Sequence, residues 1–233
     1  MRNKSLLGLA MLTVSFSASA GMEDDPLLTM VKIDQLEIRN TDGSDPLVFD
    51  GQMWIGKDLN KLWIKSEIER VDGETEENEL QFLYSRAIAP YWDFQVGWRK
   101  DFKPDPDQNW LAVGVQGLAP YFFEVDAAVF ISDESQANLR LEAEYELLFT
   151  QRLILSPEIE VNLFTDDDEE RGVGSGLSDV EAGLRLRYEI RREFAPYIGV
   201  NWTKKFGNTA DFAEVDGEET EDTQFVAGIR TWY

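Results

Sequence analysis

The stretch Ser178-Asp-Val-Glu-Ala-Gly-Leu-Arg-Leu-Arg-Tyr-Glu-Ile190 alternates between apolar and charged residues. Leu184 and Leu186 lie on the apolar side of this alternation, and Arg185 lies on the charged side. Because successive side chains of a strand point to opposite faces, a period of two predicts a strand and not an amphipathic helix. A short turn leads into a second predicted strand at 194–206, so the whole stretch predicts a β-hairpin.

The opening of that second strand, Ala195-Pro196-Tyr197, recurs upstream in the chain. Similar triplets are Ala89-Pro90-Tyr91, Ala119-Pro120-Tyr121 and Ser156-Pro157-Glu158. Proline is tolerated at the first residue of a strand, where no ladder donor is needed, so we interpret each triplet as the start of a strand. Their spacing of roughly 30 to 40 residues indicates a repeated unit of two strands and a turn.

From Thr29 onward the sequence predicts twelve strands. Their limits are 29–39, 47–57, 62–71, 79–88, 91–101, 110–118, 121–131, 138–149, 153–164, 178–190, 194–206 and 223–233. Most have about ten residues, the length that crosses a membrane, whereas globular strands most often have about five or six. Short turns alternate with longer acidic loops at 40–46, 72–78, 102–109, 132–137, 165–177 and 207–222. This pattern predicts an all-β fold, an antiparallel up-and-down transmembrane β-barrel of about 12 strands over residues 29–233.

A soluble β-sandwich is the alternative, because its strands alternate in the same way with the polar face in water. Aromatic residues near predicted strand ends favour the barrel, since aromatic girdles lie at membrane interfaces. These aromatics are Trp63, Tyr84, Tyr91, Trp92, Trp98, Trp110, Tyr121, Tyr197 and Trp202. The final strand ends in Thr231-Trp232-Tyr233, which resembles the C-terminal signal of outer-membrane barrels.

The first twenty residues have the pattern of a secretory signal. Arg2 and Lys4 form a basic start, residues 6–16 are apolar, and Ala18-Ser-Ala20 is a small-residue cleavage site. We therefore predict a signal peptide at 1–20, a short periplasmic segment at 21–28, and the barrel from residue 29.

Composition excludes several classes of function. The chain carries 22 basic and 45 acidic residues, a net charge of −23, which argues against nucleic acid as a partner because duplex binding relies on basic side chains. It has no cysteine, so it forms neither disulfides nor thiolate metal sites, and it has no histidine. Barrel phospholipases and proteases use a histidine base, so we predict that the protein is not an enzyme.

In a barrel the charged face of each strand points into the lumen. We expect there Glu67, Glu69, Asp93, Glu124, Asp126, Glu142, Glu144, Glu146, Glu158, Glu160, Asp179, Glu181 and Glu189, together with Lys65, Arg99, Arg140, Arg185 and Arg187. Acid exceeds base in this set, and rings of Asp and Glu favour cations in pores. The alternative is a structural network in which the carboxylates pair with arginines across neighbouring strands.

Several runs resemble the C-terminal barrel domain of the copper resistance protein B family. They are Asp34-Gln-Leu-Glu37, Gly56-Lys-Asp-Leu-Asn60, Leu83-Tyr-Ser-Arg-Ala-Ile-Ala-Pro90, Arg99-Lys-Asp-Phe-Lys-Pro104, Gly114-Val-Gln-Gly-Leu-Ala-Pro-Tyr121, Leu139-Arg-Leu-Glu-Ala-Glu-Tyr-Glu-Leu147, Gly174-Ser-Gly-Leu-Ser-Asp179 and Glu181-Ala-Gly-Leu-Arg-Leu-Arg-Tyr-Glu-Ile-Arg-Arg-Glu-Phe-Ala-Pro196. The resemblance covers residues 30–233. It implies an outer-membrane barrel that helps a Gram-negative cell to export or tolerate copper, with periplasmic copper-handling proteins as partners.

The resemblance makes copper the expected ion, transported or transiently bound. Family members commonly carry a Met- and His-rich segment before the barrel, whereas here only 21–28 precede the first predicted strand. Thioethers suit Cu(I), although isolated methionines often serve as packing residues. The candidate metal ligands are Met30, Met53, Glu142, Glu144, Glu146, Asp179 and Glu181.

Two functions without copper remain open at this stage, a general cation-preferring channel and a structural or adhesion barrel. The acidic runs 166–170 and 218–222 lie in predicted outer loops. They could bridge divalent cations to lipopolysaccharide, since hard cations take oxygen ligands, or they are simply solvated loops. Outer-membrane lipid and lipopolysaccharide are therefore expected partners.

Overall fold

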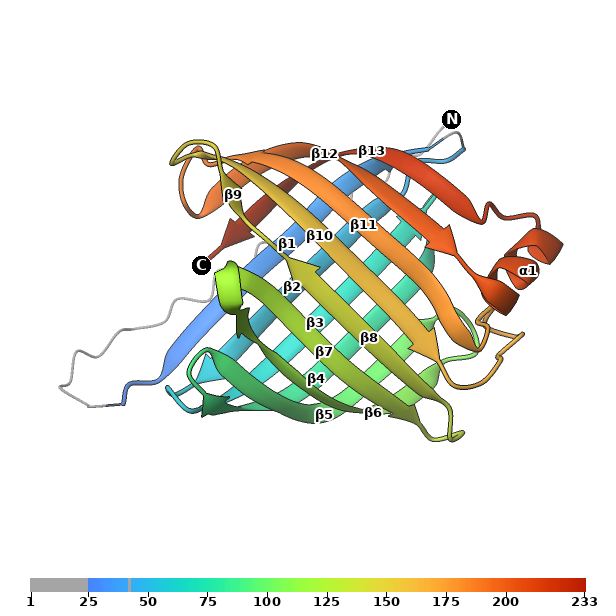
Figure 1. The fold of residues 1–233 in the computed structure, drawn as a ribbon, viewed down its shortest axis with the longest axis horizontal. Helices are drawn as coiled ribbons and strands as arrows, with labels where there is room; N and C mark the ends of the chain where they lie inside the picture. Colours follow the sequence, from blue (N-terminus) through green and yellow to red (C-terminus); the bar gives the residue numbers. More distant parts are fainter. Residues whose placement is uncertain (1–24, 42) are drawn as a thin grey trace, which may run out of the picture.

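The computed structural model describes residues 25–41 and 43–233, so the predicted signal peptide lies outside the described residues. One antiparallel sheet winds around and closes on itself (Figure 1). Strands adjacent in sequence are adjacent in the sheet, and β1 (Leu28–Asn40) closes the ring by pairing with β13 (Glu221–Trp232). The predicted up-and-down β-barrel is confirmed.

The other elements follow in chain order. They are β2 (Leu47–Gly56), β3 (Asn60–Val71), β4 (Glu74–Ala89), β5 (Trp92–Lys103), β6 (Gln108–Ala119), η1 (Pro120–Phe122), β7 (Phe123–Ser132), β8 (Ala137–Glu144), β9 (Leu147–Leu148), β10 (Leu153–Phe164), β11 (Gly176–Tyr188), β12 (Phe194–Lys205) and α1 (Gly207–Asp216). The short β9 continues the course of β8 after a break at residues 145–146, and both pair with β10. The barrel therefore has the twelve strands that the sequence predicts.

Side chains alternate between the inner and the outer face of the barrel with a period of two residues. Residues that face each other across neighbouring strands share a side of the sheet, so the pairs Glu142–Glu160 and Glu160–Glu181 point inward together. Outward positions are apolar and open, with Ile198 65% and Phe225 70% exposed. The apolar face is thus outside and the charged face inside, the arrangement of a membrane barrel and the reverse of a soluble sandwich.

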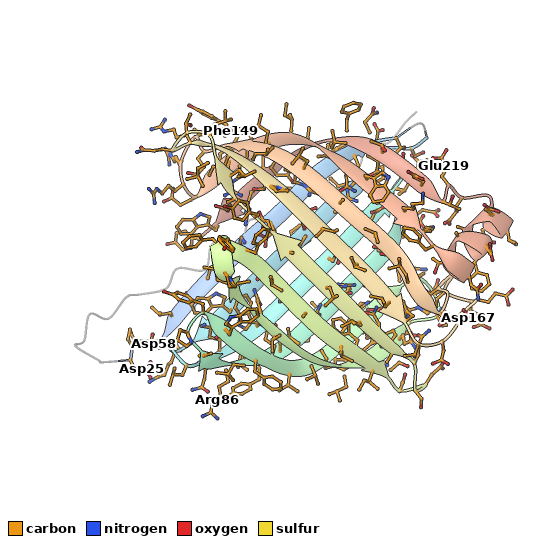
Figure 2. All side chains as sticks on the ribbon, viewed as in Figure 1. Asp25, Asp58, Arg86, Phe149, Asp167 and Glu219 are labelled. Carbon is orange, nitrogen blue, oxygen red and sulfur yellow. The ribbon has the colours of Figure 1, made fainter. Side chains whose placement is uncertain are left out.

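The two ends of the barrel differ. The longer loops and α1 lie at one end, which we call the long-loop end, and Asp167 and Glu219 mark it in Figure 2. The turns at 57–59, 90–91, 120–122 and 149–152 lie at the opposite, short-turn end, where Asp58 and Phe149 are labelled. Among the described residues, no helix is long and apolar enough to cross a membrane.

Three of the four proline triplets do not start strands, which corrects the sequence interpretation. Pro90 lies in a turn, Pro120 opens η1, and Pro157 lies inside β10. Only the triplet at Pro196 stands at the beginning of a strand. At Pro90 and Pro120 the reason is local geometry, because the tyrosines that follow them have a φ near +67° and +68°, the left-handed conformation of turn residues.

Two predicted loops are also corrected. The acidic loop predicted at 72–78 is a two-residue turn at Asp72-Gly73, because both residues have positive φ and β4 begins at Glu74. The loop predicted at 207–222 contains α1, which ends at the left-handed Gly217. A glycine in this conformation is the usual C-terminal stop of a helix.

The aromatic girdle is only partly where the sequence places it. Trp63, Trp110 and Tyr197 are buried and face the lumen, whereas Tyr91 and Tyr121 are exposed at the short-turn end. Trp63 and Trp110 belong to a group of apolar side chains on the inner face of the barrel, which we call the inner apolar cluster. It contains Trp63, Leu83, Trp110, Ala112 and Phe130, with Met30, Trp54, Ala128 and Phe164 packed against it.

Candidate functional site: the charged lumen

The lumen contains a cavity of about 1400 Å³. Its lining comes from every long strand of the barrel, and acidic residues outnumber basic ones along it. Of the predicted lumen residues, all line this cavity except three. Asp93 is paired with Lys61 at 3.0 Å, Glu146 lines a second, smaller cavity, and Glu189 lies just beyond the end of β11.

Glu37 is the centre of the most buried ion-pair network. Its side chain is inaccessible to solvent, and its carboxylate accepts hydrogen bonds from Arg39 Nε and from Arg185 Nε and Nη2, each at 2.9 Å. The hydroxyl of Tyr197 donates a further bond to it at 2.9 Å. Arg39 also binds Glu181 at 2.9 Å. This network ties β1 to β11 and β12, the region where the sheet closes.

A second network lies on the opposite wall and alternates arginines with aromatic rings. The guanidinium of Arg99 lies 5.6 Å from the centroid of Trp110 and 4.5 Å from that of Phe130, and Arg140 lies 5.7 Å from Phe130. Glu79 forms ion pairs with both arginines, at 2.9 and 3.0 Å. Such stacking fixes guanidinium groups in place, so this wall is rigid and largely neutralised.

A third network joins β8 and the 145–146 break to the closing strands. Arg230 pairs with Glu144 at 2.8 Å and with Asp34 at 3.3 Å. Arg187 pairs with Glu146 and lies 3.7 Å from Glu144. Two of the predicted metal ligands, Glu144 and Glu146, are therefore engaged by arginines.

Carboxylates nevertheless remain in excess. Two rows of carboxylates run across neighbouring strands, one above the other along the barrel. The first row consists of residues paired in register, Asp126, Glu142, Glu160 and Glu181. The second row consists of Glu124, Glu144 and Glu158. Among the described residues, no ion pair is recorded for Glu142 or Glu124. The first row contains a neutralising arginine at Glu160, where Arg140 Nε lies at 3.3 Å, and a lysine at Asp126, where Lys65 lies at 2.6 Å.

The predicted metal ligands do not form one site. Met30 and Met53 lie on opposite faces of the sheet, because Met30 packs against the inner apolar cluster and Met53 is 42% exposed on the outer face. Glu142 and Glu181 share the first row, while Asp179 accepts a hydrogen bond from Asn162 at 3.0 Å. Among the described residues, no group of three or more Asp and Glu side chains is arranged to hold a metal ion.

The sequence analysis missed one residue of the cavity wall at the long-loop end. Arg171, in the loop between β10 and β11, lines the cavity and binds Asp101 at 2.8 Å. The same loop is attached to α1, because Asp167 accepts hydrogen bonds from the backbone N–H of Ser175 at 2.6 Å and from Asn208 at 3.0 Å. These bonds lower the pKa of Asp167. No sequence signal marks Arg171, since its loop has no periodicity, whereas the period of two in 29–39 could have identified Glu37.

Comparisons with known proteins agree with this architecture. The family model of copper resistance protein B precursor (CopB) matches residues 27–233. The chain is 48% identical over 212 residues to copper resistance protein B of Escherichia coli, a match that covers 91% of this chain and 72% of that protein. It is 44% identical to the copper resistance protein B homolog of Pseudomonas syringae pv. tomato, with the same coverage. The NanC porin is 10% identical with a TM-score of 0.57, covering 88% of this chain and 99% of the porin, a likeness that shows the fold alone.

Proposed function

The chain belongs to the copper resistance protein B family and is an exported outer-membrane β-barrel, and from this we propose that its acidic lumen exports or sequesters copper ions. The observation that supports the proposal is the row of Asp126, Glu142, Glu160 and Glu181 across four neighbouring strands. Cation-selective pores are built from such arrays of carboxylates.

The ligands available to copper in this proposal are carboxylate oxygens. The sequence has neither histidine nor cysteine, so imidazole and thiolate coordination are unavailable to the chain itself. Carboxylate oxygens are hard ligands without the affinity that soft ligands have for Cu(I), so the proposal is transient binding during passage and not a tightly held ion. Glu142 is the principal residue, because its carboxyl group is in no ion pair within the described part of the chain.

Orientation follows from a general property of outer-membrane barrels, whose short turns face the periplasm and whose longer loops face outward. The short-turn end would thus receive copper from periplasmic copper-handling proteins, the partners we propose. Acidic residues at the long-loop end, such as Glu218 and Glu219, would face lipopolysaccharide on the outside. The proposal includes no enzymatic step.

The test uses Glu142→Gln, which removes one charge without leaving an arginine unpaired. We expect reduced preference for potassium over chloride in planar bilayers and reduced copper tolerance when the variant replaces the wild-type gene. Glu134→Gln is the matched control, because Glu134 is an exposed residue in the turn between β7 and β8. Unchanged ion preference and unchanged copper tolerance in Glu142→Gln would overturn the proposal.

The triple variant Glu142→Gln, Glu144→Gln and Glu146→Gln is a stronger but less specific probe. It removes three charges and so should lower ion preference further. It also removes both carboxylate partners of Arg187 and leaves Arg230 with Asp34 alone among its carboxylate partners in the described residues, so its folding must be checked by circular dichroism. A cation preference without any effect on copper tolerance would favour a general cation channel.

A further inference from the structure

At the short-turn end of the lumen, side chains of β2, β3 and β10 fill the space along their part of the wall. Trp54 and Trp63 lie 6.1 Å apart between ring centroids, and Lys61 lies over Trp54 and binds Asp93. Across the barrel Ile154 is also buried. The lining of the large cavity accordingly begins at Lys65 on β3, five residues from the start of that strand.

Elsewhere the lining reaches nearer to this end, to Arg187 on β11 and to Arg230 on β13. On β6 and β7 the cavity lining extends to Leu118 and Glu124, next to the turn that contains η1. Here the cavity approaches the short-turn end, immediately beside the break between β8 and β9.

The same place is the interruption in the hydrogen-bonded wall. β7 and β8 remain paired down to Glu124 and Glu144, beyond which β7 gives way to η1. Within the part of the chain that the structure describes, β9 pairs with β10 alone, and the start of β7 lies apart from it in Figure 1. Backbone N–H groups of Tyr145 and Phe149 bind β10 carbonyls, so by the alternation of an antiparallel ladder the backbone groups of Glu146 point toward β7, where no strand follows.

A second cavity of about 510 Å³ occupies this interruption. Phe122, Tyr145, Leu147 and Leu148 form its apolar walls, and Glu124 and Glu146 are its carboxylates. Leu118 and Glu124 line both this cavity and the large one, so the two adjoin.

We propose that the lumen opens toward the periplasm sideways, through the gap between β7 and β9, and that Glu124 is the carboxylate a cation passes as it moves from the second cavity into the large one. We call this gap the side opening. The inference rests on the proposed function, because it describes how ions reach the carboxylate rows. It differs from an axial channel, whose ions would leave through the short-turn end of the barrel inside the ring of strands.

The test closes the side opening chemically. The chain has no cysteine, so introduced cysteines are the only thiols. Phe122→Cys and Leu147→Cys place thiols on opposite sides of the gap, and a short bis-methanethiosulfonate reagent links them. We expect the potassium current through the full-length protein in planar bilayers to fall several-fold after linking, and to recover when a reductant removes the link.

The control pair is Ile55→Cys with Leu62→Cys. These residues face each other across β2 and β3 at the same end of the barrel, where the ladder is intact and both side chains point outward. Linking them should leave the current unchanged, because that wall is already closed. Glu124→Gln tests the same path without a cross-link, since loss of this carboxylate should lower the potassium current.

The outcomes separate the two proposals. A current that survives complete linking of Phe122→Cys to Leu147→Cys, with cation preference intact, would overturn the side opening and leave the carboxylate path standing. Absence of any cation current in the unmodified protein would overturn both. A loss of current in the control pair would also count against the side opening, because closure of the gap would then not be its cause.

Discussion

Arg171 extends from an outer loop into the lumen and donates from its Nη2 to Asp101 Oδ2 at 2.8 Å. The same carboxylate oxygen accepts the indole N–H of Trp110 at 2.9 Å, and Arg99 binds Asp101 as well. Asp101 thus holds one arginine from the wall and one from the loop. The loop arginine lines the long-loop end of the cavity, while the wall arginine keeps Asp101 neutralised without it.

Removal of the loop arginine should therefore open the pore without unfolding the barrel. We expect Arg171→Ala to raise single-channel conductance in planar bilayers and to lower the free energy of unfolding by only about 1.5–3 kcal/mol, the range for one hydrogen bond to a charged group. Arg152→Ala, in an exposed short turn, is the control for loss of one positive charge. Equal conductance in Arg171→Ala and the wild type would mean that the narrowest point lies elsewhere.

Glu37 should be the most costly carboxylate to replace. It accepts hydrogen bonds from two arginines and a tyrosine, and its replacement leaves buried positive charge without its partner. We expect Glu37→Gln to lower the free energy of unfolding by about 3–5 kcal/mol. Denaturant titration in detergent micelles would measure this, with Glu134→Gln, which should change it by no more than about 0.5 kcal/mol, as the exposed control.

The sequence predicts the strand limits and the alternation of charged and apolar faces, and it misses the placement of individual aromatic side chains. The limits of 153–164 match β10, and the period of two placed Glu142 and Glu160 inside, because alternation is a property of any strand. The sequence places Trp63 and Trp110 at the membrane interface, because aromatic type alone does not distinguish the two faces of a strand. Their neighbours do distinguish the faces, since Trp63 is two residues from Lys65 and Trp110 is paired with Arg99 across the strands.

The break at 145–146 was not foreseen for a related reason. The alternation continues without interruption from Leu139 to Leu147 in the sequence, so it predicts one strand. The interruption arises from the neighbour, since β7 begins only at Phe123, after the turn at Pro120–Phe122, and offers no partner to β9. A pattern within one segment contains no information on whether the adjacent segment is long enough to pair with it.

The two methionines give a prediction about ligand type. Met53 is on the outer face, and Met30 packs against the inner apolar cluster and is not among the residues that line the cavity. We expect Met30→Leu and Met53→Leu each to leave copper tolerance unchanged and to alter the free energy of unfolding by less than about 1.5 kcal/mol, as volume-conserving substitutions. Reduced copper tolerance in Met30→Leu, with folding intact by circular dichroism, would assign a role in the copper path to its thioether.

The attachment of α1 to the neighbouring loop should depend on pH through Asp167. Hydrogen bonds from Ser175 and Asn208 lower its pKa below the ordinary value of 3.8. Because the folded-state pKa is the lower one, the stabilisation is fully present above the ordinary pKa and is lost as the pH falls through the lowered value. Attachment should therefore be intact at neutral pH and weaken only in strong acid.

Hydrogen exchange of the α1 amides measures this attachment. We expect protection of α1 in the wild type to be constant from neutral pH down to about pH 5 and to decrease below about pH 4, after correction for the intrinsic exchange rate. Asp167→Asn cannot gain a proton, so its protection should be lower at neutral pH and should lack this acid-dependent step. Asp133→Asn, an exposed change in the turn between β7 and β8, is the matched control. Identical pH profiles in Asp167→Asn and the wild type would show that α1 is held by other contacts, such as the hydrogen bond from Gly174 N–H to Thr209 Oγ1 at 2.8 Å.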